Sequence, residues 1–325
     1  MQKFIIITTI NKKTEAINKF STLLKDWQII LIGDKKSKNI KSEGNITFLS
    51  VEDQKKLNFK TAKISPYNHY ARKNIGYLYA MKLGADIIYD TDDDNIPYDD
   101  WIFTDFKHSE YTTSKNKFLN IYKYFTKENV WPRGYPLDEI NKKSETKNIL
   151  SDVKVGVWQG LADIDPDVDA IFRLTINKKI TFDKNKSVVL DKNIYCPFNS
   201  QNTLWHKDNF ALLYFPSTVS FRFTDILRGY ITQKLLWENN YHLGFTQATV
   251  YQKRNSHDLM KDFNDEIECY LNIKSVVNIL DKLNFNSNYL TNLRETYIAL
   301  KNNKIVTATE LERLDAWIND LKNLI

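Results

Sequence analysis

Glycine is scarce in this chain of 325 residues, where nine glycines are fewer than half the usual share. None of them falls in a GxG or GxxxxGK pattern, which excludes the glycine-rich phosphate loops of Rossmann dinucleotide sites and Walker sites. The two cysteines, Cys196 and Cys269, are too few and too far apart for a disulfide framework or a CxxC metal site. We therefore expect free thiols in a reducing compartment.

Long apolar runs are missing as well. No stretch approaches 18 consecutive apolar residues, and the run at 4–10 is too short for a signal sequence. We expect a cytoplasmic protein without a transmembrane span, and peripheral contact with the cytoplasmic face of a membrane stays open. The formal charge of +6 suits a polyphosphate ligand, nucleic acid or an anionic membrane. Because acidic residues are interspersed and no RRM, KH or zinc pattern occurs, nucleic acid is not expected.

Apolar runs of strand length alternate with helical patterns over most of the chain. This alternation predicts an α/β fold with a mixed, largely parallel sheet flanked by helices. After about residue 260 the pattern becomes helical, and Thr307 with Glu310 reads as a capping box. We expect two units, 1–258 and 259–325. The expected strands are 3–9, 29–32, 46–49 and 87–89, and the expected helices include 13–24, 67–82, 225–238 and 307–324.

An acidic cluster, Asp90-Thr91-Asp92-Asp93-Asp94, follows the strand at 87–89. In open α/β sheets, ligands bind beyond the carboxyl ends of the strands. Asp90, Asp92 and Asp94 alternate along an extended chain and can point to one side, where their charges raise one another's pKa unless a cation relieves them. Carboxylate oxygens suit Mg²⁺ or Mn²⁺. A solvated acidic turn is the alternative interpretation.

The segment ARKNIGYLYAMKLGADIIYDTDDD at 71–94 resembles the nucleotide-sugar segment of GT-A glycosyltransferases. Further blocks resemble the STELLO family in the same order: WPRGYPL (131–137), WQGLADIDPDVDAIFRLT (158–175), PFNSQNTLW (197–205), TDILRGYITQKLLW (224–237) and YQKRNSHD (251–258). The RGYP and PDxDA patterns also resemble, more weakly, the reversibly glycosylated polypeptides, which include UDP-arabinopyranose mutases.

The STELLO resemblance implies a Rossmann-like GT-A fold and a metal-dependent glycosyltransferase. Such an enzyme moves a sugar from a nucleotide-sugar donor, with a UDP-sugar favoured, to a glycan or glycolipid acceptor. The resemblance implies that Mn²⁺ or Mg²⁺ is held by Asp92, Asp94 and His257. It also implies a set of nucleotide-binding residues: Thr8, Thr9, Asn11, Asp34, Arg72, Asp93 and Arg254. The sequence does not determine the oligomeric state.

An inverting transferase needs a base for the acceptor hydroxyl. Asp225, at the start of the helix 225–238, is the first candidate. The acidic segment 163–169 supplies the rivals: Asp163, Asp165, Asp167 and Asp169. Arg133 matches the block in which mutases carry a glycosylated arginine, so a nucleotide-sugar mutase stays open. A non-catalytic scaffold of a polysaccharide synthesis complex is the third hypothesis.

Overall fold

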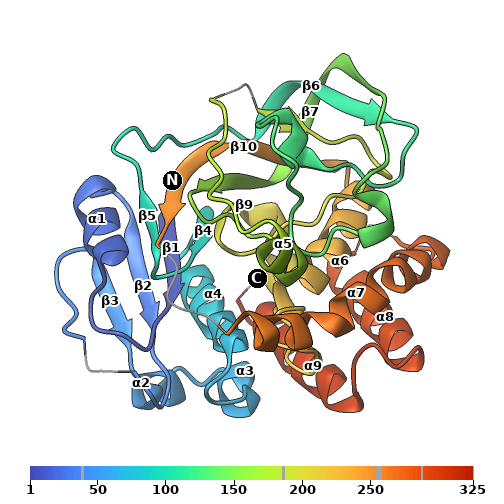
Figure 1. Cartoon of the computed structure of the whole chain (residues 1–325). Helices are drawn as coiled ribbons and strands as arrows, with labels where there is room; N and C mark the ends of the chain where they lie inside the picture. Colours follow the sequence, from blue (N-terminus) through green and yellow to red (C-terminus); the bar gives the residue numbers. More distant parts are fainter. Residues whose placement is uncertain (38–39, 185–186, 254–257, 287, 325) are drawn as a thin grey trace.

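The computed structural model describes residues 1–37, 40–184, 187–253, 258–286 and 288–324. Its N-terminal part supplies four parallel strands in the order β3-β2-β1-β4 (Figure 1). Alternate residues of β1 are buried on opposite faces of the sheet, as a strand with a core on both sides requires. The strands are β1 (Lys3–Thr8), β2 (Gln28–Ile32), β3 (Ile46–Leu49) and β4 (Ile87–Thr91).

The sheet continues beyond β4 in the order β9-β7-β10-β5, with β6 paired to β7 and β8 paired to β10. Strand β9 runs antiparallel to both neighbours, so β7 and β10 have the same direction as β1 to β4. The prediction of a mixed, largely parallel sheet flanked by helices is confirmed, and this arrangement is consistent with a Rossmann-like GT-A fold. The further strands are β5 (Asn95–Pro97), β6 (Lys107–Ser114), β7 (Thr146–Asp163), β8 (Val188–Val189), β9 (Asn202–His206) and β10 (Tyr241–Gln252).

Helices cover both faces of the sheet. Helix α1 packs on one face through Ile17 and Phe20, whereas α4, α6 and the C-terminal helices share the larger core on the other face. The α-helices are α1 (Glu15–Leu23), α2 (Val51–Lys56), α3 (Lys60–Ile64), α4 (Lys73–Lys82), α5 (Ala170–Thr175), α6 (Thr224–Glu238), α7 (Leu259–Lys282), α8 (Tyr289–Asn302) and α9 (Ala308–Lys322). Short 3₁₀ helices are η1 (Tyr70–Arg72), η2 (Ile121–Tyr124), η3 (Leu137–Glu139) and η4 (Lys207–Leu213).

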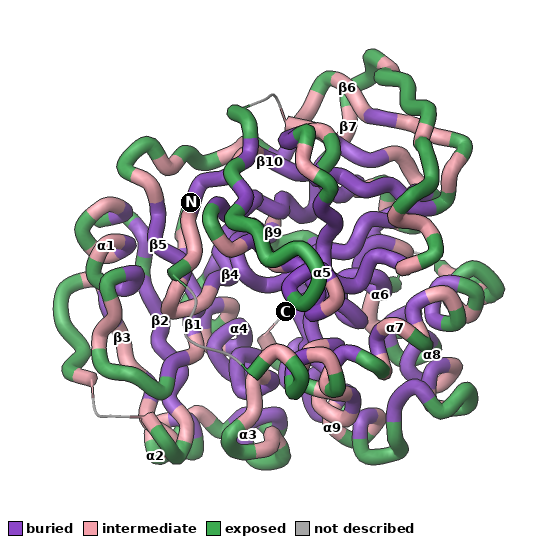
Figure 2. Tube along the Cα trace, in the orientation of Figure 1, coloured by how far each residue is buried: buried purple, intermediate pink, exposed green. Residues whose placement is uncertain are grey.

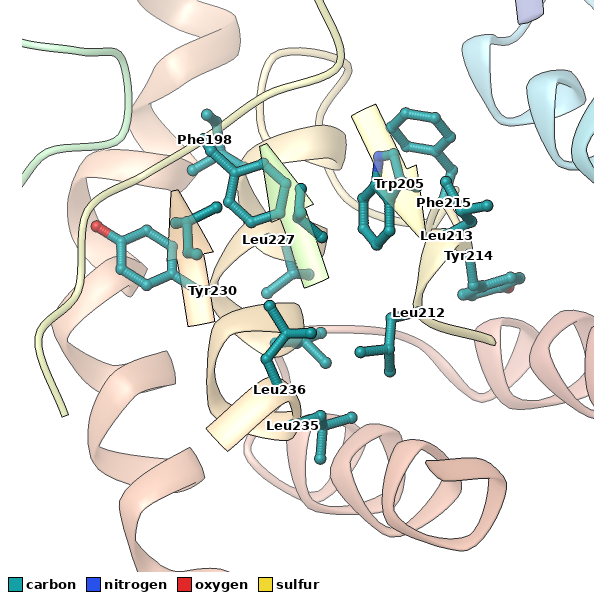
Figure 3. Packing of buried hydrophobic residues seen from close by; sticks show 14 of the residues in the cluster. Phe198, Trp205, Leu212, Leu213, Tyr214, Phe215, Leu227, Tyr230, Leu235 and Leu236 are labelled. Carbon is teal, nitrogen blue, oxygen red and sulfur yellow. The ribbon is translucent and has the colours of Figure 1, made fainter. Parts of the chain in front are cut away.

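The C-terminal helices confirm the predicted change of pattern after residue 260. Val276, Tyr297 and Trp317 lie in the same buried cluster as Ile6 of β1. In Figure 2, buried stretches are concentrated along the central strands, and exposed stretches lie at the periphery. Figure 3 shows part of this cluster, in which Leu227 and Tyr230 of α6 pack near Phe198 and Trp205. The boundary between residues 258 and 259 stays a prediction.

Two details differ from the sequence prediction. The helix expected at 67–82 begins with η1 at Tyr70, because Pro66 and the left-handed Asn68 (φ 52°) break the chain before it. The capping box at Thr307 is absent: its side chain makes no capping hydrogen bond, and Glu310 instead accepts backbone N–H groups of Ser217 and Thr218. Glu310 therefore joins two distant segments.

Three smaller predictions concern the cysteines, the end of the helix 67–82 and membrane-spanning helices. Cys196 and Cys269 are buried free thiols, as the sequence predicts. The helix 67–82 ends as expected, because Gly84 adopts φ +81° after α4. Within the described ranges, every helix is too short or too polar to cross a membrane.

Candidate functional site

Two adjoining cavities lie at the carboxyl ends of the parallel strands. The first, of about 460 Å³, follows β1 and β2 and is called the nucleoside cavity below. The second, of about 260 Å³, follows β4 and reaches α6 and the end of β10; it is called the acidic cavity. The two cavities form one cleft because they share lining residues: Thr8, Tyr70, Asp93 and Phe221.

The nucleoside cavity brings together the residues predicted to line a nucleoside: Thr8, Thr9, Asn11 and Asp34. Asp93 connects them to the acidic cluster. Its Oδ2 accepts hydrogen bonds from Thr9 Oγ1 at 2.5 Å and from Asn11 Nδ2 at 3.1 Å. Residues more than 80 positions apart thus meet because β1 and β4 are neighbours in the sheet.

Arg72 lines the nucleoside cavity and not the acidic one. Its buried guanidinium donates to Gln54 Oε1, with Nε at 3.1 Å, and to the Ser65 carbonyl at 3.3 Å. The ring of Tyr67 lies 4.6 Å from the Arg72 Cζ atom. Burial lowers the pKa of Arg72, although the charge of Asp34 opposes the shift. The structure thus places Arg72 at the nucleoside end, away from Asp92 and Asp94.

The acidic cluster divides into one buried and three lining carboxylates. Asp90 is sealed below the cavity by Lys73 Nζ at 2.6 Å and Arg228 at 3.0 Å. Lys73 Nζ also reaches Asp92 Oδ1 at 3.1 Å. Asp90 and Asp92 do face the same lysine, but Asp90 is buried beneath the cavity, and only Asp92 and Asp94 of the three line it.

Asp92 and Asp94 line the acidic cavity, and their raised pKa values indicate that neighbouring groups do not fully neutralise their negative charges. Burial, followed by the charge of Asp92, raises the pKa of Asp94 to about 7, although Gln252 Nε2 donates to Asp94 Oδ2 at 2.9 Å. Burial also raises the pKa of Asp92, against the charge of Lys73. A bound cation would stabilise the charged forms of Asp92 and Asp94, whose own hydrogen bonds do not offset the rise in their pKa.

Asp92 and Asp94 can hold a metal ion if a bound diphosphate and water supply the other ligands. Outside the gaps at 38–39, 185–186, 254–257, 287 and 325, no group of three or more His, Cys, Asp or Glu side chains is arranged to hold a metal. Mg²⁺ and Mn²⁺ are commonly held by one or two carboxylates together with substrate phosphates and water, so Asp92 and Asp94 suffice with a bound diphosphate. The predicted third ligand, His257, and the predicted phosphate contact, Arg254, lie outside the described residues.

The far end of the acidic cavity is built around Arg133. Its guanidinium donates to Asp167 Oδ1 at 2.7 Å and Oδ2 at 2.9 Å, to Asp225 Oδ2 at 3.0 Å, and to the Arg222 carbonyl. Burial disfavours the charged guanidinium, but the two carboxylates outweigh burial and raise the pKa of Arg133. Burial alone would raise the pKa of Asp167, but the charge of Arg133 lowers it. Asn199 Nδ2 completes the group by donating to Asp167 Oδ2 at 2.7 Å.

The other carboxylates of the 163–169 segment lie outside this cavity. Asp165 is paired with Arg173, Asp163 accepts from the Tyr98 hydroxyl at 2.9 Å, and Asp169 caps the N-terminus of α5. Of the candidate bases, Asp225 and Asp167 therefore line the cleft, whereas Asp165, Asp163 and Asp169 do not.

Sequence reasoning overlooked several lining or supporting residues. Tyr70 belongs to the apolar stripe of the predicted helix, yet its hydroxyl donates to Asp92 Oδ1 at 3.0 Å. Lys73 was hidden in the same helical pattern. The buried polar residues at 199–201, directly before β9, contribute Asn199 and Gln201 to the cavity. Polar residues at the start of an apolar strand, within the block 197–205, were the available signal.

Comparisons with known proteins agree with the pattern of blocks. The family model of the STELLO glycosyltransferases matches residues 222–325, a range that holds Arg222, Asp225 and Arg228. The curated "Probable glycosyltransferase STELLO2" of Arabidopsis thaliana is 27% identical over 348 residues, and "Probable glycosyltransferase STELLO1" of the same plant is 28% identical over 347 residues. The matches cover 98% of this chain. The chain is similar to STELLO proteins over almost its whole length.

The STELLO-like chain spans 44% of the length of these two relatives. Among solved structures, a chain described as "Crystal Structure of a Mycobacterial Protein" aligns with a TM-score of 0.41 and 9% sequence identity. That alignment covers 86% of this chain and 73% of the other.

Proposed function

We propose that this protein is a metal-dependent glycosyltransferase that uses a nucleotide-sugar donor, with a UDP-sugar as the favoured class, and a glycan or glycolipid acceptor. The single observation that carries the proposal is the continuous cleft, in which a nucleoside-sized cavity adjoins a cavity lined by Asp92, Asp93 and Asp94. The likeness to two proteins named as probable glycosyltransferases supports the same reaction class.

In this proposal Asp92 and Asp94 hold Mn²⁺ or Mg²⁺ beside the donor diphosphate. When bound there, such a cation supplies positive charge that stabilises the departing diphosphate. Thr9 and Asn11 fix Asp93 by hydrogen bonds, so the nucleoside end and the diphosphate end of the cleft keep a constant separation.

We assign the base to Asp225, which lines the cavity on the sugar side of the acidic cluster. The acceptor hydroxyl oxygen attacks the anomeric carbon, the bond from that carbon to the diphosphate oxygen breaks, and the diphosphate leaves with the electron pair. The hydroxyl proton moves to the Asp225 carboxylate. Arg133 orients this carboxylate through its hydrogen bonds.

The geometry favours a transferase over a mutase. A glycosylated arginine needs a nucleophilic, uncharged nitrogen, whereas Asp167 and Asp225 stabilise the charged form of Arg133 and raise its pKa. The Arg133 nitrogens also donate to acceptors within the protein. Both features oppose attack by Arg133 on a sugar.

Turnover of donors tests the proposal. The protein with Mn²⁺ should release UDP from at least one of UDP-glucose, UDP-galactose and UDP-xylose, with water or added oligosaccharides as acceptor. Asp225→Asn should reduce release at least a hundredfold, the usual contribution of a general base. The matched control is Asp165→Asn, which also loses a carboxylate paired with an arginine but lies outside the cavity. Equal activity of Asp225→Asn and the wild type would refute the base assignment.

A further inference from the structure

The acidic cavity carries an excess of negative charge. Five aspartates and two arginines line it, which gives a formal charge of 2 − 5 = −3: Asp92, Asp93, Asp94, Asp167, Asp225, Arg133 and Arg222. The layer beneath does not alter this sum. There Lys73 and Arg228 are balanced by Asp90 and Glu266, all of them buried.

Both lining arginines are already paired with carboxylates of the protein. The five N–H groups of Arg133 have acceptors within the protein: Nε donates to Asp167, one terminal nitrogen to Asp225 and the Arg222 carbonyl, and the other to Asp167 and Asp225. Arg222 is paired with Glu266 of α7, to which its Nε donates at 2.9 Å and a terminal nitrogen at 2.6 Å. Among the described residues that line this cavity, no arginine or lysine lacks a carboxylate partner.

The end of the acidic cavity where the sugar would lie carries several side chains that can bind hydroxyl groups. The carboxylates of Asp167 and Asp225 accept hydrogen bonds, and the side chains of Asn199 and Gln201 lie beside them. Phe221, whose side chain is 55% exposed, lies at the mouth with its ring 5.7 Å from that of Tyr70. Carboxylates and amides beside an exposed aromatic ring suit the O–H groups and C–H faces of a neutral sugar.

We infer that the subsite formed by Asp167, Asn199 and Asp225 takes an uncharged sugar and rejects uronate sugars. This inference rests on the proposed function and specifies its donor. A uronate would bring its carboxylate toward Asp167 and Asp225, where like charges repel in a partly desolvated site. A cation at Asp92 and Asp94 would be matched by the charge of the donor diphosphate. At the sugar end, Asp167 and Asp225 share the single positive charge of Arg133, while the charge of Arg222 is matched by Glu266, so one negative charge remains in excess there.

Donors that differ in one group test this inference. UDP-glucose and UDP-glucuronate differ only at C6, which carries CH₂OH in the first and a carboxylate in the second; GDP-mannose and GDP-mannuronate differ in the same way. Each donor is titrated into the protein in Mn²⁺ by calorimetry. For the nucleotide that binds, the Kd of the uronate donor should be at least tenfold higher than the Kd of its neutral partner. A uronate that binds as tightly as its neutral partner would overturn the inference and leave the proposed function intact.

Two outcomes separate the inference from the proposed function. If UDP and GDP both fail to bind in Mn²⁺, the proposed function fails and the inference with it. If the nucleotides bind, raising NaCl from 0.05 to 0.5 M should reduce the ratio of the uronate Kd to the neutral-sugar Kd, because salt screens electrostatic repulsion. A ratio that stays constant with salt would indicate a steric cause and would overturn the electrostatic assignment.

A variant locates the effect. Asp167→Asn removes one negative charge from the subsite and should reduce the ratio of uronate Kd to neutral-sugar Kd severalfold. The matched control, Asp165→Asn, removes a charge outside the cavity and should leave the ratio unchanged. An unchanged ratio in folded Asp167→Asn would refute the subsite, and the salt titration of the wild-type protein keeps the test decisive if that variant does not fold.

Discussion

Arg133 joins three segments of the chain through its side chain: the 163–169 turn, the start of α6 and the backbone of Arg222. Both carboxylate partners are largely buried, so removal of the guanidinium would leave two unpaired charges. We predict that Arg133→Met lowers the free energy of unfolding by about 3–5 kcal/mol, measured by urea denaturation. Such a loss would identify Arg133 as a structural centre of the cleft.

Arg294→Met is the control for that substitution. Arg294 forms a similar pair with Asp315 at 2.8 Å, but both side chains are about half exposed. The expected loss is below about 1 kcal/mol, because exposed ion pairs contribute little. Equal losses in the two variants would contradict the claim that burial makes the Arg133 group indispensable.

Gly134, next to Arg133, has a second structural role. It adopts φ +83°, and a Cβ atom at this position would collide with Cγ2 of Ile226 in α6. Gly84 has a similar φ of +81° with open space around it, so Gly84→Ala should cost only the backbone strain of about 1–2 kcal/mol. Gly134→Ala should cost roughly a further 1–3 kcal/mol from overpacking. Thermal unfolding of both variants gives the difference, and equal costs would refute the collision.

At the residue scale, the sequence located one end of the cleft better than the other. Thr8, Thr9, Asn11 and Asp34 could be predicted because they follow strands whose carboxyl ends must meet at one edge of the sheet. Lys73 could not, since helical periodicity identifies a buried face but does not reveal that a lysine on it meets two carboxylates. Which of the candidate bases line the cleft also needed the structure, because spacing does not show that Arg133 holds Asp225 and Asp167 and not Asp165.

At the scale of elements, the segment 214–223 between η4 and α6 is held by helices far along the chain. Glu310 of α9 accepts from the backbone N–H groups of Ser217 and Thr218 and from the Tyr214 hydroxyl, and Glu268 of α7 accepts from Ser220 N at 2.6 Å. This segment carries Phe221 and Arg222 to the cleft. The C-terminal helices therefore shape the site without lining it.

Loss of the Glu310 charge should loosen this segment. We predict that Glu310→Gln destabilises the protein by about 1–3 kcal/mol, because buried N–H groups lose an ionised acceptor. Hydrogen exchange in 214–223 should accelerate while that of β1 to β4 stays unchanged, as peptide-level mass spectrometry can measure. Glu312→Gln, at an exposed position of α9, is the control. Unaltered exchange in 214–223 would contradict the clamp.

Some of the strands and helices could be predicted from the sequence and others could not. The four N-terminal strands were predictable because both faces are buried and their sequences are continuous apolar runs. Strand β7 was not, because its first half is largely exposed and polar and pairs mainly with β6. The start of the helix near Tyr67 was missed because Pro66 and Asn68 break the chain before a 3₁₀ turn, which periodicity alone does not detect.

On the scale of the whole molecule, the C-terminal helices and the sheet share one hydrophobic core. Trp317 of α9 is fully buried, Asp320 of α9 accepts from the Lys60 and Thr61 backbone at the start of α3, and the STELLO family model spans the predicted boundary at residue 258. We predict that a fragment 1–258 does not fold cooperatively, because removal of α7 to α9 exposes apolar surface. A fragment with a cooperative thermal transition would support two separate units.

The central claim, a nucleotide–metal site in the cleft, is tested most directly by titrating the whole protein with UDP and GDP in Mn²⁺ and in EDTA. One nucleotide should bind in Mn²⁺, lose at least tenfold in affinity in EDTA, and lose the metal effect in Asp92→Asn. The control Asp99→Asn removes an exposed carboxylate paired with Lys19 and should bind like the wild type. Binding that is equal in Mn²⁺ and EDTA, or absent for both nucleotides, would contradict the account.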